Sequence, residues 1–469
     1  MNSQTLETDY LIVGSGAVGM AFADVILTET DADIIMVDQY AKAGGHWNVA
    51  YPFVTLHQPS AYYGVSSLEL SKGRIDQEGL NKGLGELASG AEICAYFDEV
   101  MRHHFLPTGR LRYFPKCTYQ GEGRFVSDLH GKSYQVQVRK KTVDATYLKT
   151  SVPSTHTPNF SIAEGVHFMP LNDLPKVQQP PEAFVIIGGG KTGIDACIWL
   201  LEQGIDPDQI QWIVSRDAWL IDRKNTQPSP EFFADSIGGQ AAQFEAVAQA
   251  SSIEDLFDRL ENAGVLIRID QTVKPTMFHG ATISQLELAE LRRIKNVIRL
   301  GRVQRIESDR IVLEKGEIPT SAERIHVDCS ASAITNLDMK PIFAGNLITP
   351  QTVRSYQPVF SAAFVAHIEA TFEDEKQKNE LCKVVPLPNH DTDWIRALAV
   401  FMTNQYNWGQ NKNLRQWLRN NRLDGFSQLT AKAKEDPAKL AIMNRIRANV
   451  MPAMMKLQQF IAQLDKQTT

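Results

Sequence analysis

The pattern of apolar and polar positions contains the same predicted unit twice: a short apolar strand, a glycine-rich turn and a helix. In the first copy, residues 10–13 form the apolar run, Gly14 opens the turn, and residues 20–27 read as a helix. In the second copy, residues 184–187 precede Gly188 and a helix continues to Leu201. Strands that alternate with helices in this way predict parallel sheets covered by helices. The chain is therefore predicted to be an α/β protein with two Rossmann-type dinucleotide-binding domains.

The C-terminal part has a different, helical pattern from His390 onward, which predicts a helical C-terminal extension. Apolar residues recur there every three or four positions along one helix face, at Met443, Ile446, Val450, Met454, Leu457, Ile461 and Leu464. Pro452 falls within this stripe and is expected to kink or divide the helix. Such a stripe usually packs on its own core; the alternatives are a subunit interface in a homodimer and the wall of a substrate tunnel.

These patterns divide the chain into four parts. The first part of the first dinucleotide-binding domain spans residues 1–165, and the second dinucleotide-binding domain spans 166–325 with a helical insertion at about 225–263. A return segment of the first domain spans 326–385, and the helical extension spans 386–469.

Composition narrows the classes of partner. The 469 residues are 43% hydrophobic and 22% charged, as in an ordinary globular protein, and the net charge is -6. The excess of acidic residues argues against a nucleic-acid-binding surface. The sequence contains no run of about 18 apolar residues, so no membrane span is predicted. The N-terminus has no secretory pattern, and the five cysteines show no CxxC spacing for a metal or redox dithiol. A cytoplasmic location and no metal site are expected.

The first glycine motif has the chemistry of a pyrophosphate site. Gly14 permits a tight turn, Gly16 lets the backbone approach a phosphate, and Gly19 allows close packing of helix on strand. Ala17 and Val18 then lie in the first helical turn, where free N–H groups favour an anion. Asp38 ends the next predicted strand and is placed to accept both hydroxyls of an adenosine ribose. The motif alone does not separate FAD from NAD.

The second motif predicts NADPH. Its residues are Gly188, Gly190, Lys191, Thr192 and Gly193. The following strand ends in Ser215-Arg216 in place of an acid, and an arginine there can bind a 2′-phosphate with two parallel hydrogen bonds. A P-loop is excluded, because that motif requires glycine at position 185, which is Val185. Two such sites in one chain suit an enzyme that passes a hydride from nicotinamide to flavin.

With these motifs in order, the chain resembles the class B flavoprotein monooxygenases, that is, the flavin-containing and Baeyer–Villiger monooxygenases. The matching stretches are 14–19, Asp38, 44–47, Tyr51-Pro52, 56–63, 192–195 and 327–331. The resemblance implies that Gly45, His46 and Trp47 lie along FAD and that the stretch 56–63 faces its reactive ring. It also implies that 327–331 returns the chain to the FAD lobe and that the helix 361–370 points at the flavin pyrimidine. For that helix, an ordinary core helix is the alternative.

The resemblance makes His57, Gln58 and Ser60 the candidate catalytic residues. His57 stands where these families place Asp or Asn, and a histidine there can donate or accept a hydrogen bond near neutral pH. A second departure is the family fingerprint Phe-x-Gly-x-x-x-His, which is displaced here to Phe160, Gly165 and His167.

The implied function is FAD- and NADPH-dependent insertion of one oxygen atom from O₂ into a small organic substrate through a peroxyflavin. The substrate would be a nitrogen or sulfur nucleophile, or a carbonyl compound. The displaced fingerprint leaves an NADPH-dependent flavin reductase or dehydrogenase as the first alternative. A non-catalytic flavin-binding or sensing protein is the alternative of another class.

Overall fold

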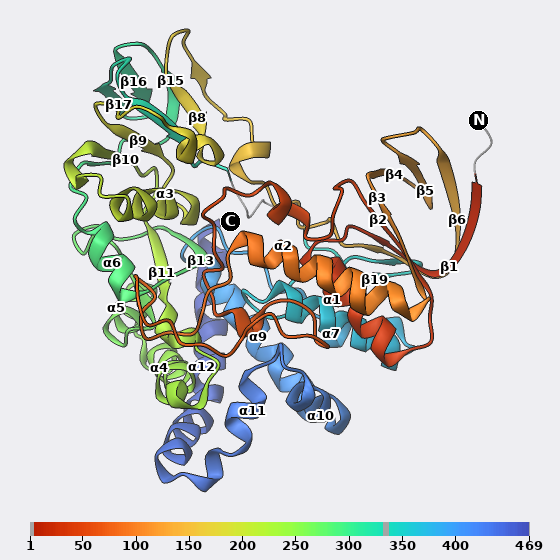
Figure 1. Cartoon of the computed structure of the whole chain (residues 1–469). Coiled ribbons are helices and arrows are strands. Elements are labelled where there is room, and N and C mark those ends of the chain that lie inside the picture. Colours follow the sequence, from red (N-terminus) through yellow and green to blue (C-terminus); the bar gives the residue numbers. More distant parts are fainter. Residues whose placement is uncertain (1–3, 332–336, 469) are drawn as a thin grey trace.

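The first lobe is a parallel sheet built around the first glycine turn. The computed structural model describes residues 4–331 and 337–468, while residues 1–3, 332–336 and 469 lie outside the described part (Figure 1). The strands run in the order β19-β20-β6-β1-β2-β3, and the hairpin β4–β5 is attached through β6. They are β1 (Gln4–Val13), β2 (Ile34–Asp38), β3 (Leu111–Pro115), β4 (Cys117–Gly121), β5 (Arg124–Ser127), β6 (Ser133–Asp144), β19 (Phe343–Ala344) and β20 (Leu347–Ile348).

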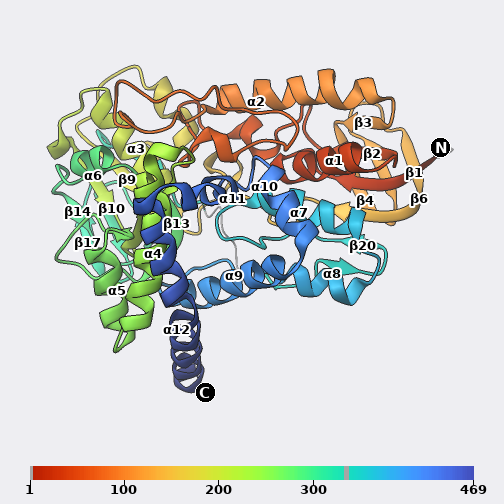
Figure 2. The ribbon, with the colours of Figure 1, turned by 90° about the horizontal axis from the view of Figure 1, so that it is seen from below.

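Helices cover one face of this sheet and the hairpin covers the other. The helices are α1 (Ala17–Glu29), α2 (Gly90–Glu99), α7 (Pro358–Thr371) and α8 (Glu375–Leu381). α1 and α7 lie side by side, and buried Phe22 and Phe364 belong to the same apolar core between helices and sheet (Figure 2). On the opposite face, Leu11 and Phe125 share a smaller core. The predicted late helix is thus almost wholly buried, as a core helix is.

The second lobe has the same plan around the second turn. Its strand order is β14-β10-β9-β18-β8, and every neighbouring pair is parallel. These strands are β8 (Phe168–Pro170), β9 (Phe184–Ile187), β10 (Ile210–Ile213), β14 (Val297–Ile298) and β18 (Ile325–Asp328), with the helices α3 (Lys191–Glu202) and α6 (Gln285–Leu291). A small sheet, β17-β16-β15-β7, packs beside it and consists of β7 (Ser161–Ile162), β15 (Val303–Ile306), β16 (Arg310–Leu313) and β17 (Gly316–Pro319). The prediction of an α/β fold with two Rossmann-type domains is confirmed.

Two domain boundaries differ from the sequence prediction. β18 begins at the last residue of the segment assigned to the second domain and continues into the return segment, yet the whole strand pairs with β9 and β8 of the second lobe. The chain rejoins the first sheet later, where β20 pairs with β6. β7 lies before the boundary at 165 but pairs with β15 of the second lobe. A short buried strand carries no signal for the sheet that it joins, so the pattern alone misplaced these edges.

Between 218 and 283 the second lobe carries additional structure. A sheet of order β12-β11-β13 consists of β11 (Ala218–Asp222), β12 (Leu266–Ile267) and β13 (Met277–Ile283). Two helices, α4 (Phe233–Gln249) and α5 (Ile253–Asn262), occupy the region predicted as a helical insertion.

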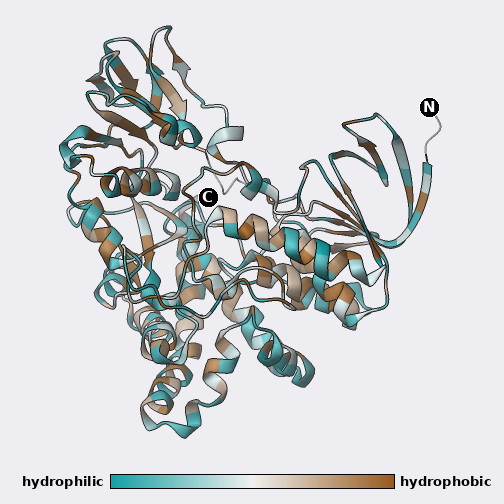
Figure 3. Cartoon of the chain, in the orientation of Figure 1, coloured by the Kyte–Doolittle hydropathy of each residue, from teal (hydrophilic) through white to brown (hydrophobic). Residues whose placement is uncertain are grey.

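The C-terminal extension is helical, as predicted, and packs on this additional structure. Its helices are α9 (Asp393–Gln410), α10 (Lys412–Asn420), α11 (Phe426–Ala431) and α12 (Pro437–Thr468). α12 runs beside α4, and the apolar stripe of α12 shares a core with α4, α5 and α9 (Figures 1 and 2). α12 runs without interruption through Pro452, which therefore does not divide it. In contrast to α12 with its apolar stripe, α10 consists mostly of hydrophilic residues apart from the buried Leu414 and Leu418 (Figure 3).

Candidate functional site

The first glycine turn has the backbone geometry that a pyrophosphate site requires. Gly14 has a φ of 100°, and its N–H donates to the Val37 carbonyl at 2.8 Å. A Cβ on Gly19 would lie 2.0 Å from the Gly14 carbonyl oxygen, so only glycine fits there. α1 begins at Ala17 and Val18, and no side chain of the described chain caps it at Gly16. Its first N–H groups are therefore available to an anion.

Asp38 lies at the carboxyl end of β2, beside this turn. It is only 6% exposed, and one carboxylate oxygen accepts hydrogen bonds from the Ser15 N–H at 2.5 Å and the Ser15 hydroxyl at 2.8 Å. The other oxygen accepts from the Tyr40 N–H at 2.7 Å. The carboxylate is thus held in place at the position where a ribose would meet it.

The turn at residues 44–47 closes over the first glycine turn. Gly45 begins the 3₁₀ helix η1 (Gly45–Val49), and a Cβ on it would lie 2.9 Å from Cα of Gly16. Trp47 in this turn donates from Nε1 to the Tyr63 hydroxyl at 2.7 Å, and burial lowers the pKa of the neighbouring His46 to about 4. The stretch 44–47 therefore joins the nucleotide turn to the 56–63 loop, and its position along FAD stays a prediction.

The second glycine turn repeats the backbone of the first. Gly188 has a φ of 138°, and a Cβ on Gly193 would lie 2.0 Å from the Gly188 carbonyl oxygen. Gly190 precedes α3 without a side-chain cap from the described residues, and a Cβ there would meet no atom within 4 Å. Thr192 lies half-buried in the first turn of α3. This open backbone leaves room for a second diphosphate.

Arg216 follows β10 and lies near the positive charge of Arg302. Ser215 is exposed, and Arg216 donates from Nη2 to Oδ1 of Asn389 at 2.7 Å. The same oxygen lies 3.1 Å from Nε2 of His279. Burial and then the positive charge of Arg302 lower the pKa of Arg216. An anionic ligand such as a 2′-phosphate would relieve this repulsion.

Lys191 has a different setting from the one predicted. It forms an ion pair with Asp195 one turn later in α3, and the Tyr51 hydroxyl donates to the other Asp195 oxygen at 2.6 Å. Burial and then the charge of Asp195 raise the pKa of Tyr51 well above its ordinary value. The lysine charge is thus compensated by Asp195, and the hydrogen bond from Tyr51 to Asp195 connects α3 to the chain segment that follows the 44–47 turn.

His57 lies where the two lobes meet. Its Nδ1 accepts a hydrogen bond from the Thr282 N–H of β13 at 3.2 Å, and its carbonyl accepts from Nε of Arg223 at 3.1 Å. Burial, together with the charges of Lys191 and Arg223, lowers the pKa of His57 to about 3. The ring is therefore neutral at physiological pH, and because Nδ1 is the acceptor, Nε2 carries the proton.

The other two candidate catalytic residues differ in how they are held. The Ser60 hydroxyl donates to the Glu86 carbonyl at 2.8 Å and accepts from the Ala88 N–H at 2.7 Å, which fastens its loop to a neighbouring one. Gln58 is half-buried beside His57 in the chain. The catalytic assignments of all three residues remain predictions.

Two arginines that the sequence analysis did not select organise this region. Arg223 is 1% exposed, pairs with Glu287 at 2.8 Å, and also donates to Oδ1 of Asn81 at 3.1 Å. Arg422, from the C-terminal extension, donates to the carbonyls of the 61–68 loop: Ala61 at 2.9 Å, Tyr63 at 2.8 Å, Val65 at 2.5 Å and Leu68 at 2.8 Å. Both join segments far apart in sequence, and neither belongs to a local motif.

Two cysteines also come together near the second turn. Cys197 on α3 and Cys329 after β18 are both buried, and the Cys329 carbonyl would lie 2.4 Å from a Cβ on Gly188. Burial, and then the neighbouring Cys197 thiol, raises the pKa of Cys329 well above its ordinary value. The raised pKa values favour the neutral thiol at both positions, which is the less nucleophilic form of cysteine.

Comparisons with known proteins identify close relatives. Uncharacterized protein Rv2000 and Uncharacterized protein MT2056 of Mycobacterium tuberculosis, and Uncharacterized protein Mb2023 of Mycobacterium bovis, are each 46% identical over 454 residues. Each match covers 97% of this chain and 83% of the relative. No family model matches the chain.

Solved structures are similar at much lower identity. A flavin-containing monooxygenase from Stenotrophomonas maltophilia is 12% identical with a TM-score of 0.44, and the match covers 80% of this chain and 99% of that one. A closed cyclohexanone monooxygenase is 14% identical with a TM-score of 0.47, covering 93% and 98%. A bacillithiol disulfide reductase from Staphylococcus aureus is 13% identical with a TM-score of 0.41, covering 77% and 97%. Two of these three proteins are monooxygenases by name, and the third is a disulfide reductase.

Among the described residues, no helix combines the length and apolar character needed to cross a membrane.

Proposed function

The chain belongs to one family with the three mycobacterial proteins, and on that premise we propose that it is an FAD- and NADPH-dependent oxidoreductase that works as a monooxygenase. One observation carries the proposal: two dinucleotide turns of the same backbone have opposite charges where the ribose would bind. The first ends in the held carboxylate of Asp38, and the second ends in Arg216. An acid suits ribose hydroxyls, and an arginine suits a 2′-phosphate.

The residues of the first lobe fit FAD. Gly14, Gly16 and the first turn of α1 would hold its pyrophosphate, while the 44–47 turn and the 56–63 loop would lie along the remainder. FAD, when bound, supplies hydride acceptance and reaction with O₂, which side chains alone do not provide. Gly188, Gly190 and Gly193, with Ser215 and Arg216, would hold NADPH.

We assign His57 the part of a hydrogen-bond donor at the meeting point of the lobes. The Thr282 N–H fixes the ring through Nδ1, so the proton on Nε2 is directed by the protein. With a pKa of about 3 the ring takes up no second proton near neutral pH, so the donor carries no charge. Arg223 holds the backbone of the same residue, so its position depends on both lobes. Ser60 would position the loop, and Gln58 remains the third candidate.

The proposed partners are O₂ and a small organic substrate, either a nitrogen or sulfur nucleophile or a carbonyl compound. The apolar stripe of α12 contributes to the protein's own core, and a homodimer through the C-terminal helices stays a prediction. The cytoplasmic location also stays a prediction; the five cysteines, all of them free thiols, suit a reducing compartment.

The proposal is tested with the full-length protein. It should be purified with FAD, reduced by NADPH without oxygen, and mixed with O₂ while NADPH consumption and hydrogen peroxide are measured with thioethers, amines and ketones. A monooxygenase transfers ¹⁸O from ¹⁸O₂ to one of these compounds and releases little peroxide. Release of peroxide in full proportion to NADPH with every compound favours the reductase alternative. Absence of flavin from the folded protein contradicts the proposal altogether.

His57 has its own test within this assay. We expect His57→Ala to raise the peroxide released per NADPH while FAD remains bound, because the directed Nε2 proton is lost. An unchanged ratio would remove His57 from the mechanism.

A further inference from the structure

An acidic residue stands directly beside the arginine that would recognise a 2′-phosphate. Asp217 directly follows Arg216 in the chain, in the segment after β10, and an acid in such a segment ordinarily selects the unphosphorylated ribose. A free carboxylate there would repel the 2′-phosphate of NADPH. The chain thus carries both a residue that favours this phosphate and one that opposes it.

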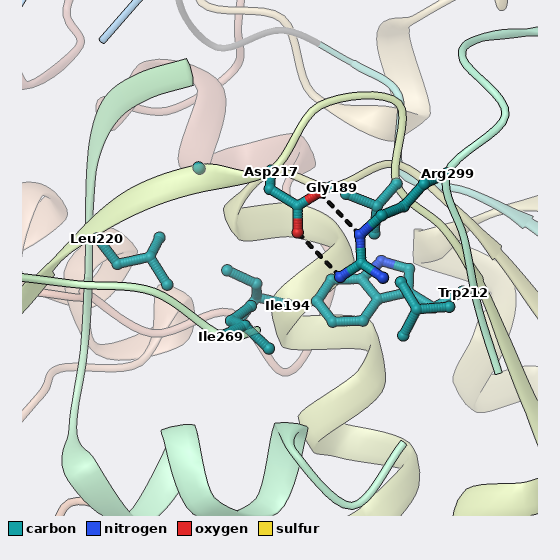
Figure 4. Close-up of a pocket in the computed structure, with 10 residues that line it drawn as sticks. Gly189, Ile194, Trp212, Asp217, Leu220, Ile269 and Arg299 are labelled. Atoms are coloured by element: carbon teal, nitrogen blue, oxygen red, sulfur yellow. Dashed lines mark hydrogen bonds and ion pairs between the residues drawn. The ribbon is translucent and has the colours of Figure 1, made fainter. Parts of the chain in front are cut away.

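Arg299 occupies both oxygens of Asp217. Its Nε donates to one oxygen at 2.9 Å and its Nη2 donates to the other at 3.0 Å (Figure 4). This is the two-pronged geometry in which an arginine binds a carboxylate most strongly. Nη2 also lies 3.1 Å from Asp270, and hydrogen bonding to Asp217 raises the pKa of Arg299. The guanidinium therefore stays charged beside two acids.

The sheet brings this pair to the second nucleotide turn. Val297 and Ile298 of β14 pair with Trp212 and Ile213 of β10, so the residues that follow the two strands leave the same edge of the sheet. Figure 4 shows Asp217 and Arg299 next to Gly189, with Trp212 below them. The cavity that these residues line has a volume of about 20 Å³, enough for one water molecule and not for a base or a sugar. The pair is therefore a charge arrangement at the rim of the site and not a ligand pocket of its own.

We propose that Arg299 determines the coenzyme preference: by binding both oxygens of Asp217, it leaves Arg216 as the charge that a 2′-phosphate meets. The inference rests on the proposed binding of NADPH at this turn. Arg302 adds a second positive charge near Arg216, whereas Asp393 is the acid that acts on Arg216 from the C-terminal extension. Removal of Arg299 would release Asp217 and Asp270 together on the same side of the site.

The test measures nucleotide binding and is independent of turnover. Calorimetric titration of the full-length, FAD-loaded protein with 2′,5′-ADP and with 5′-AMP isolates the contribution of the 2′-phosphate. We expect wild type to bind 2′,5′-ADP at least tenfold more tightly than 5′-AMP. Arg299→Gln should narrow this ratio about tenfold, and adding Asp217→Asn and Asp270→Asn to that variant should restore it. An unchanged ratio in Arg299→Gln would overturn the inference.

A second comparison keeps the test valid if Arg299→Gln alone fails to fold. In the Asp217→Asn, Asp270→Asn background neither of the acids that Arg299 contacts is left, so adding Arg299→Gln should leave the ratio within twofold. A further tenfold loss there would show that Arg299 contacts the phosphate itself, and would contradict the proposal. If wild type binds neither nucleotide or prefers 5′-AMP, the NADPH assignment fails before any variant is examined.

Discussion

The two glycine turns have the same backbone but different surroundings. The shared backbone provides a binding position for a nucleotide, and the surroundings determine which nucleotide suits each position. Gly19 and Gly193 lie equally close to a carbonyl oxygen, 2.0 Å from a would-be Cβ in each case. Over the first turn, however, Gly45 approaches Gly16, with Cα of Gly45 3.5 Å from a would-be Cβ. Over Gly190, a would-be Cβ meets nothing within 4 Å. A covered site suits a resident cofactor, and an open site suits a coenzyme that enters and leaves at each turnover.

The largest effect is expected from substitutions that disrupt one glycine turn at a time. Gly19→Ala should yield protein without FAD, whereas Gly193→Ala should retain FAD and lose reduction by NADPH. Each Cβ would overlap a carbonyl oxygen at 2.0 Å, at a cost of about 3 kcal/mol or more. Flavin absorbance and anaerobic reduction by NADPH are the measurements. Gly409→Ala is the matched control, because a Cβ there meets nothing within 4 Å. Loss of FAD from both variants alike would break the comparison.

The next effect sharpens the difference at the ribose end. Arg216→Ala should reduce the preference for NADPH over NADH by tenfold or more, since charged hydrogen bonds contribute about 1.5–3 kcal/mol. The measurement is kcat/KM for flavin reduction with each coenzyme. Arg305→Ala removes an exposed arginine of the same lobe and should leave the preference unchanged. An equal loss for both coenzymes would mean that Arg216 does not recognise the phosphate.

A smaller effect is expected on the pH dependence of stability, through His57 in the 56–63 loop. The pKa of His57 falls from an ordinary 6.5 to about 3 in the folded state. Between these two pH values the unfolded chain binds a proton at His57 and the folded chain does not. Stability is therefore complete above pH 6.5 and is lost progressively as the pH falls from there toward 3. His57→Gln should abolish about 1–2 kcal/mol of the drop in unfolding free energy between pH 7.5 and 5.

Urea denaturation of the FAD-loaded protein at the two pH values measures this drop. His103→Gln, at an exposed position, is the control and should leave it unchanged. Equal pH dependence of wild type and His57→Gln would show that His57 is not held neutral by the fold.

The smallest effect concerns Lys191, which begins α3 as phosphate-binding lysines do elsewhere. Its charge is paired with Asp195, so Lys191→Met should weaken NADPH binding only about threefold, or about 0.7 kcal/mol. The NADPH dissociation constant measures this, with Arg216→Ala as the reference for a true phosphate contact. A loss as large as that of Arg216→Ala would show that Lys191 turns from Asp195 to the coenzyme.

The sequence predicted the parts of the site that local chemistry dictates. The close approach of Gly19 to the Gly14 carbonyl is encoded by the glycine spacing within residues 14–19, so the sequence shows it. Asp38 can also be recognised locally, because it ends an apolar strand. Contacts between distant segments leave no such pattern. Arg223 meets the His57 backbone from 166 positions away, and nothing local marks either residue. For the same reason the sequence did not show that Cys197 and Cys329 are neighbours, or that β18 belongs to the second sheet.

Arg422 has a consequence for the order in which the protein is made. Translation delivers the N-terminal lobe first, and domains begin to fold as they leave the ribosome. The carbonyls of Ala61, Tyr63, Val65 and Leu68, however, receive their arginine only after more than 350 further residues have been added. The loop expected to face the flavin is thus completed only after the whole second lobe has been synthesised. A nascent chain that has not reached Arg422 has the nucleotide turn but lacks the finished loop beside it.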